Sequence, residues 1–146
     1  MNVTRLDHLV LSAADSSEVA AAWREVFGLR AQPALRPDGS DLELTPLPLA
    51  EHDRGGAFLE LVQAQGTDHR VAASIDENGE GMFSLSLQVD DLDAAVRELR
   101  DAGVTVDAPE PGLLPDTRAR PERRRRVARF DPATTNGVSL QLIEQA

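Results

Sequence analysis

Hydrophobic and polar positions alternate along residues 82–104, MFSLSLQVDDLDAAVRELRDAGV, in a way that predicts a strand followed at once by a helix. Positions 83–89 change between apolar and polar at every step, which is the period of a strand with one apolar face. Two aspartates follow, either of which can cap a helix, and apolar residues then recur at spacings of three and four until Gly103. The helix is therefore expected to cover the apolar side of the strand.

The segment LDHLVLSAADSSEVAAAWREVFG, residues 6–28, repeats this plan near the start of the chain. When the two segments are aligned, His8 and Ser84 occupy equivalent positions. Because neighbouring side chains of a strand point to opposite faces, both residues should project from the face away from the helices. Trp23 falls on the apolar stripe of the first helix and is expected to pack in the core.

Each of these segments is followed by further runs that favour strands. In the first half the runs are SDLELTPL and GAFLELVQA, and in the second half they are RRRVARFDP and GVSLQLIEQ. This arrangement makes Glu60 the counterpart of Gln141. The proline-rich stretch at residues 109–126 is expected to be largely loop.

The pattern as a whole predicts a single α+β domain, residues 1–146. Its two tandem β-α-β-β-β units span about residues 4–65 and 81–145, and a polar linker covers 66–80. A chain of 146 residues can bury a sufficient core without a metal or a disulfide.

Composition excludes several classes of function. The chain has no cysteine, which removes disulfides and thiolate sites and is consistent with a reducing compartment, so a cytoplasmic protein is expected. No apolar run reaches the roughly 18 residues that a membrane span needs, and the N-terminus lacks the pattern of a signal peptide. The net charge of −10 argues against a nucleic-acid partner. All 15 basic residues are arginine, so lysine Schiff-base chemistry is excluded.

Several segments resemble the vicinal oxygen chelate superfamily, which includes glyoxalase I, bleomycin-resistance proteins, extradiol dioxygenases and methylmalonyl-CoA epimerase. They are LDHLVL, VFGL, FLELV, GEGMFSLSLQVDDLDAAVRELRDAGV and FDPATTNGVSLQLIE. The last two are most similar to methylmalonyl-CoA epimerases. The resemblance implies that each unit curls its mixed sheet into half of an open barrel, with the helices outside.

The resemblance also implies where a divalent metal would bind, because family ligands come from the first and last strands of each unit. The matching positions are His8, Glu60, Ser84 and Gln141. A catalytic ion generally needs three good protein ligands, and a serine hydroxyl is a weak one. His8, Glu60 and Gln141 could form a weak site, whereas the alternative is a histidine paired with Glu60 and no metal.

Epimerase chemistry requires a base on each side of the carbon that loses its proton. The resemblance places one such base at Gln141, whose amide cannot serve, and leaves Glu43 as the nearest replacement for the other. A true metal-dependent methylmalonyl-CoA epimerase is therefore the disfavoured interpretation.

Two other functions remain open. The first is a lyase or isomerase that acts on a small oxygenated substrate, with Glu60 as acid or base and His8 as its partner. The second is a non-catalytic binding protein of the antibiotic-resistance type, and a homodimer is expected in either case. The predicted pocket residues besides His8 and Glu60 are polar: Ser12, Glu43, Ser84, Ser86, Gln88, Ser139 and Gln141.

Three further features carry expectations of their own. The seven arginines between Arg118 and Arg129 either hold an anionic group or, as the favoured interpretation, form a solvated loop that pairs with acidic surface elsewhere or with a second subunit. His52 and His69 lie in polar segments and are expected to be exposed.

Overall fold

The computed structural model divides the chain into two compact units. The first unit is His8–Phe83, and the second unit combines Met1–Asp7 with Ser84–Ala146. The structure describes residues 1–49, 56–67, 69–117 and 120–144, and their side chains except those of residues 114–124. His52 lies outside the described residues.

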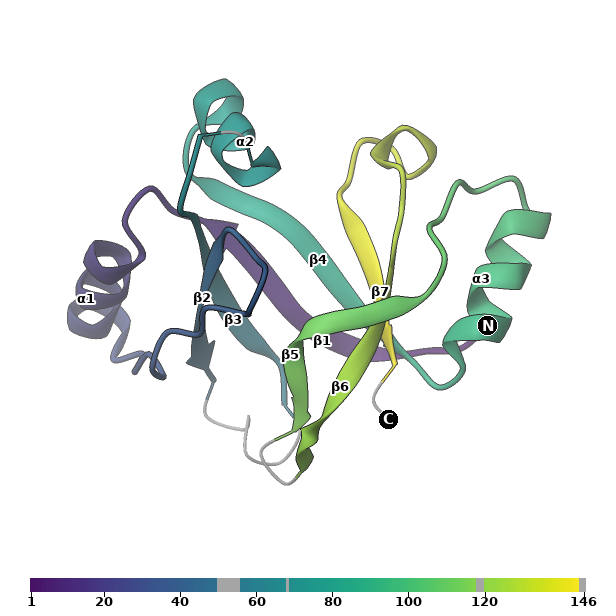
Figure 1. The fold of residues 1–146 in the computed structure, drawn as a ribbon, viewed down its shortest axis with the longest axis horizontal. Coiled ribbons are helices and arrows are strands. Elements are labelled where there is room, and N and C mark those ends of the chain that lie inside the picture. Colours follow the sequence, from purple (N-terminus) through teal and green to yellow (C-terminus); the bar gives the residue numbers. More distant parts are fainter. Residues whose placement is uncertain (50–55, 68, 118–119, 145–146) are drawn as a thin grey trace. The chain divides into compact units, whose positions relative to one another are not determined.

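The first unit holds three strands in the order β2-β3-β1 (Figure 1). Strands β1 and β3 are parallel, with His8 opposite Phe58, and β2 is antiparallel to β3. The elements are β1 (Val3–Ser12, shared with the second unit), α1 (Ser16–Phe27), β2 (Leu42–Pro48), β3 (Phe58–Ala64), α2 (Arg70–Asn78) and the start of β4 (Gly81–Val89).

The second unit holds four strands in the order β4-β7-β6-β5. Strands β4 and β7 are parallel, and the other neighbours are antiparallel. After β4 the elements are α3 (Leu92–Asp101), β5 (Glu110–Thr117), β6 (Arg120–Arg129), the short 3-10 helix η2 (Pro132–Thr134) and β7 (Leu140–Glu144). The predicted α+β class, with mixed sheet pairing and a helix after the first strand of each repeat, is confirmed.

Local sequence signals define both repeated helices as predicted. The side chain of Asp15 accepts from Glu18 N at the start of α1, and that of Asp91 accepts from Ala94 N at the start of α3. Gly28 ends α1 in the left-handed region, with φ 70°. Of the described helices, none is long and apolar enough to cross a membrane.

Helix α3 buries its apolar stripe, as the periodicity predicts. Leu92, Ala95 and Val96 are at most 2% exposed and pack with residues of β4, β6 and β7. Helix α1 differs, because Val26 and Phe27 are 69% and 65% exposed and Trp23 is only half-buried against Phe27. The expectation that Trp23 packs in the core is therefore wrong.

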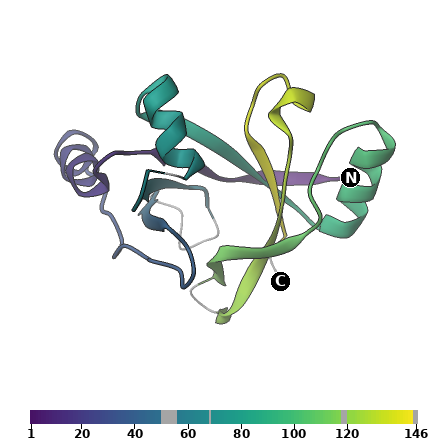
Figure 2. The same cartoon turned by 45° about the horizontal axis from the view of Figure 1, so that its top comes forward.

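The proline-rich stretch expected to be loop forms most of β5 and β6, which pair as an antiparallel hairpin (Figures 1 and 2). That prediction is wrong because β5 is the edge strand of its unit, and proline is tolerated in an edge strand, which pairs on one side only. The register of the hairpin shifts on both sides of Pro115. The polar segment 66–80 also contains regular structure, since it includes α2.

Candidate functional site

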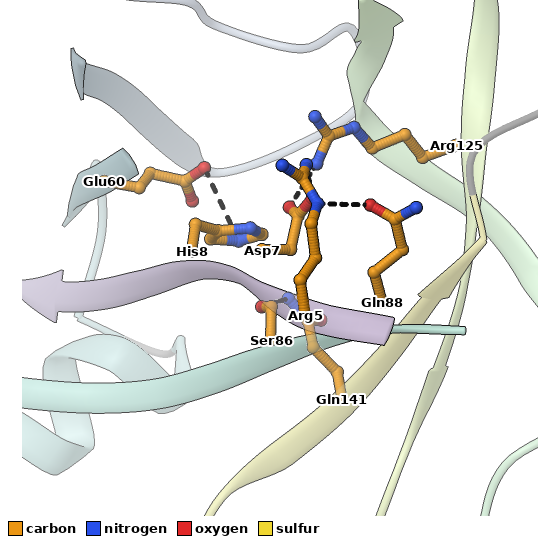
Figure 3. A network of polar contacts seen from close by, with 8 residues as sticks. All are labelled: Arg5, Asp7, His8, Glu60, Ser86, Gln88, Arg125 and Gln141. Atoms are coloured by element: carbon orange, nitrogen blue, oxygen red, sulfur yellow. Dashed lines mark hydrogen bonds and ion pairs between the residues drawn. The ribbon is translucent and has the colours of Figure 1, made fainter. Parts of the chain in front are cut away.

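The first unit brings His8 and Glu60 together on neighbouring parallel strands. His8 pairs in register with Phe58, and Glu60 follows Phe58 by two residues on β3, so all three side chains share one face. The side chains of His8 and Glu60 are only 4% and 7% exposed, and His8 Nε2 lies 3.9 Å from Glu60 Oε2 (Figure 3). The predicted His8–Glu60 partnership is thus present in the structure.

Apolar packing fixes the position of the imidazole. The ring of Phe58 is stacked on that of His8, with centroids 4.7 Å apart and an angle of 16° between the planes. Phe58 and Val62, which flank Glu60 on the same face, are 3% and 2% exposed. Burial of a carboxylate among such side chains is costly, and the imidazole within ion-pair distance offsets that cost when it is protonated.

The pair can exchange and hold a proton. The separation of 3.9 Å between His8 Nε2 and Glu60 Oε2 is an ion-pair distance, but it is too long for a hydrogen bond between these two atoms. An imidazole and a carboxylate placed this way can act as acid and base on a group that approaches both.

The described residues of the first unit bring two possible metal donors together, His8 and Glu60. Among the described residues, no group of three or more histidine, cysteine, aspartate or glutamate side chains is arranged to hold an ion. His8 and Glu60 are two donors, one fewer than a catalytic ion generally needs. Gln141 belongs to the second unit, where its Nε2 donates to Ser86 Oγ at 2.5 Å.

The other predicted pocket residues of the first unit lie on different faces. Ser12 shares the face of His8 on β1 and donates from Oγ to the Gly81 carbonyl at 3.2 Å. Glu43 accepts from Arg36 Nε at 2.7 Å. Since Glu60 is in register with Pro46, strand alternation turns Glu43 to the opposite face of the sheet. The structure does not bring Glu43 together with Glu60.

The remaining predicted pocket residues belong to the second unit. Ser84, Ser86 and Gln88 share one face of β4, and Gln141 lies in register with Ser86 on β7. Ser86 is fully buried, whereas Ser84 is half-buried. Ser139 precedes β7 and accepts from the backbone N–H of Leu85 through its carbonyl.

The second unit also contains a buried charge cluster that the sequence analysis did not identify, formed by Arg5, Asp7, Gln88 and Arg125 (Figure 3). Asp7 accepts from Arg125 Nη1 on Oδ2 and from Arg5 Nη2 at 3.1 Å on Oδ1. Its side chain is 0% exposed. The only local sign of this cluster in the sequence is Asp7 beside His8, with Arg5 two positions earlier. Arg125 is 118 residues from Asp7 along the chain, so the local sequence does not indicate their contact.

The described arginines at the end of the predicted run pair with acids. Arg126 makes two hydrogen bonds of 2.9 Å to Asp93 and one of 3.0 Å to Glu144, and Arg129 pairs with Glu110. The hydrogen bond from Arg126 lowers the pKa of Asp93, and the same contact raises the pKa of Arg126. Arg126 and Arg129 thus pair with acidic side chains, as the favoured interpretation of the run expects, whereas Arg125 of the same run is buried rather than solvated.

His69 has a structural role. Its Nδ1 accepts from the backbone N–H of Val71 and so caps α2, and the residue is half-buried rather than exposed.

Comparison with known proteins places the chain in a family. The sequence profile of the Glyoxalase/Bleomycin resistance protein/Dioxygenase superfamily matches residues 7–119, most of the chain, and the protein belongs to this superfamily. The resemblance inferred from the sequence motifs is thereby confirmed. No curated protein matches the chain.

Several solved structures share the fold of this chain. A Streptomyces coelicolor methylmalonyl-CoA epimerase variant in complex with 2-nitronate-propionyl-CoA is 24% identical, with 99% of each chain covered and a TM-score of 0.84. The Mycobacterium tuberculosis methylmalonyl-CoA epimerase is also 24% identical, with 99% of this chain and 89% of that chain covered and a TM-score of 0.82. A hypothetical protein from Bacillus halodurans is 19% identical, with coverages of 97% and 94% and a TM-score of 0.81. These likenesses establish a shared fold.

Proposed function

We propose that this protein is a lyase or isomerase that moves a proton next to a carbonyl group of a small oxygenated substrate. The observation that carries the proposal is the buried His8–Glu60 pair, held by the stack of Phe58 on His8. Fold likeness to methylmalonyl-CoA epimerases supports the same class of chemistry.

The roles of the two residues follow from their chemistry. Ionised Glu60 accepts the proton from the substrate carbon, and the buried apolar side chains of Phe58 and Val62 flank it on the same face of the sheet. His8, with Nε2 turned toward the carboxylate, supplies the balancing charge and returns a proton to the substrate. A substrate group that lies against both residues can thus lose and regain a proton.

We propose that the reaction needs no metal, since the described residues of the first unit bring two donors together, His8 and Glu60, rather than three. The likeness to epimerases does not extend to the last-strand base, because Gln141 has an amide that cannot accept a proton at neutral pH. We also propose that the protein is cytoplasmic and forms a homodimer. The exposed apolar side chains of Val26 and Phe27 on α1 support association of two copies.

The experiment is deuterium exchange in D₂O, followed by proton NMR, with a panel of acyl thioesters, 2-oxo acids and hydroxyketones. Loss of the signal from the carbon beside the carbonyl reports proton removal directly. We expect Glu60→Gln to lower the exchange rate by about 10²–10⁴-fold, the usual contribution of a general base. The control is Glu77→Gln, an exposed glutamate of α2, which should exchange at the wild-type rate.

Three results would count against the proposal. Exchange at the wild-type rate in Glu60→Gln would show that Glu60 is not the base. Loss of exchange in the presence of EDTA would show that the reaction needs a metal. Saturable binding of panel compounds without exchange would favour the binding-protein alternative.

A further inference from the structure

We propose that the start of α2 in the first unit is a pH-sensitive switch, which neutral His69 holds closed and which opens when the imidazole takes up a proton. Helix α2 (Arg70–Asn78) lies between the two sequence repeats, and His69 occupies its N-cap position (Figure 1). The inference is independent of the proton-transfer proposal, because neither His8 nor Glu60 takes part in this cap.

The cap uses a ring nitrogen that must be free of a proton. His69 Nδ1 accepts a hydrogen bond from the backbone N–H of Val71 at 3.1 Å, and the His69 carbonyl accepts from Ala73 N at 3.1 Å. A ring nitrogen accepts only while it carries no proton, and both nitrogens of a charged imidazole are donors. Protonation of His69 therefore removes the side-chain part of the cap and sets one N–H group against another.

The backbone N–H that loses its acceptor has little access to water. Val71 is 1% exposed, and a buried donor without an acceptor costs free energy. The positive end of the helix dipole also repels a charged imidazole at this position. Both effects make the charged imidazole favour the opened turn. By linkage, opening becomes more favourable as the pH falls.

Neighbouring charges do not compensate for these effects. Among the described residues, no carboxylate lies within ion-pair distance of the His69 ring. Strand β4, whose Phe83 contacts α2, has no charged residue, and β3 packs against α2 as well. Arg70 follows His69 directly and opposes a second positive charge, whereas the two acids of α2 lie in its last turn. The charged residues of α2 and of these two strands are Arg70, Asp76, Glu77 and Glu60.

The other two α-helices of the described chain have caps of a different kind. Asp15 caps α1 and Asp91 caps α3, each through a side-chain oxygen that accepts from a backbone N–H. Histidine is the side chain whose charge ordinarily changes between about pH 5 and 8, and a carboxylate ordinarily stays ionised over that range. Helices α1 and α3 are therefore controls within the same protein.

The test is amide hydrogen exchange of the whole protein, followed by NMR at about pH 8 and about pH 5. Each rate is divided into the intrinsic rate at the same pH, which gives a protection factor. We expect the protection of Val71 and Ala73 to fall by about 5–150-fold at the lower pH, the factor that corresponds to one unsatisfied buried donor. Glu18 and Ala94, whose N–H groups are capped by aspartates, should keep their protection.

Two variants separate the cap from other effects of acid. His69→Asp supplies a carboxylate cap, so the protection of Val71 should be equal at both pH values. His69→Ala removes the cap and should leave Val71 as weakly protected at the higher pH as the wild type is at the lower pH. Four results would each overturn the assignment: unchanged wild-type protection at the lower pH, an equal fall in His69→Asp, full protection of Val71 in His69→Ala, or an equal fall at Glu18 and Ala94.

Discussion

Replacement of Asp7 by asparagine probes the buried charge cluster of the second unit. The substitution keeps the size of the side chain and removes its negative charge, which both Arg5 and Arg125 use. Arg125 is then left as a buried guanidinium without that carboxylate. Arg5, which is more exposed, is expected to regain water.

The size of the effect follows from burial. Removal of one partner from a buried ion pair typically costs about 3–5 kcal/mol, and Asp7 and Arg125 have side-chain exposures of 0% and 8%. The pair with Arg5 adds less than about 1 kcal/mol because that guanidinium is partly solvated. For a chain of this length, the sum corresponds to a fall of about 6–24 °C in the melting temperature.

The assay is urea unfolding followed by circular dichroism, with the melting temperature from calorimetry. The matched control is Asp93→Asn, which removes an aspartate that also pairs with an arginine but is 52% exposed, and it should lower the free energy of unfolding much less than Asp7→Asn does. If Asp7→Asn unfolds with the same free energy as the wild type or as Asp93→Asn, the buried cluster does not stabilise the protein as argued.

Two other measurements test the packing and the electrostatics. Leu92→Ala should lower the free energy of unfolding by about 2–5 kcal/mol in urea denaturation, because Leu92 is 0% exposed in the core under α3. Val26→Ala, at an exposed position of α1, should change the free energy of unfolding little. Equal losses in the two variants would contradict this packing. Because Arg126 lowers the pKa of Asp93 below its usual 3.8, their contribution to stability is present above that value and is lost as the pH falls through the lowered pKa. Carbon-detected NMR titration of Arg126→Gln should find the pKa of Asp93 returned toward 3.8, and an unchanged pKa would exclude Arg126 as the cause.

The sequence determined the repeated elements and part of the candidate site. Periodicity and capping are local, so the strand and helix that begin each repeat could be predicted. The sequence narrowed each helix cap to two neighbouring residues, and the structure places the caps at Asp15 and Asp91. Strand alternation, together with the family motifs, singled out His8 and Glu60 as partners. Their contact depends on parallel pairing of β1 with β3, which the structure shows.

Only the tertiary structure decided the features that depend on distant pairing. The proline-rich β5 is a strand because β6 supplies hydrogen-bond partners along an edge, a condition that local propensity does not encode. Glu43 is turned away from Glu60 by the register between β2 and β3, which no local pattern fixes. The burial of α3 and the exposure of much of the apolar face of α1 likewise follow from which strands pack against each helix. Asp7 meets Arg125 across 118 residues, because folding gathers into one buried place charges that are unrelated along the chain.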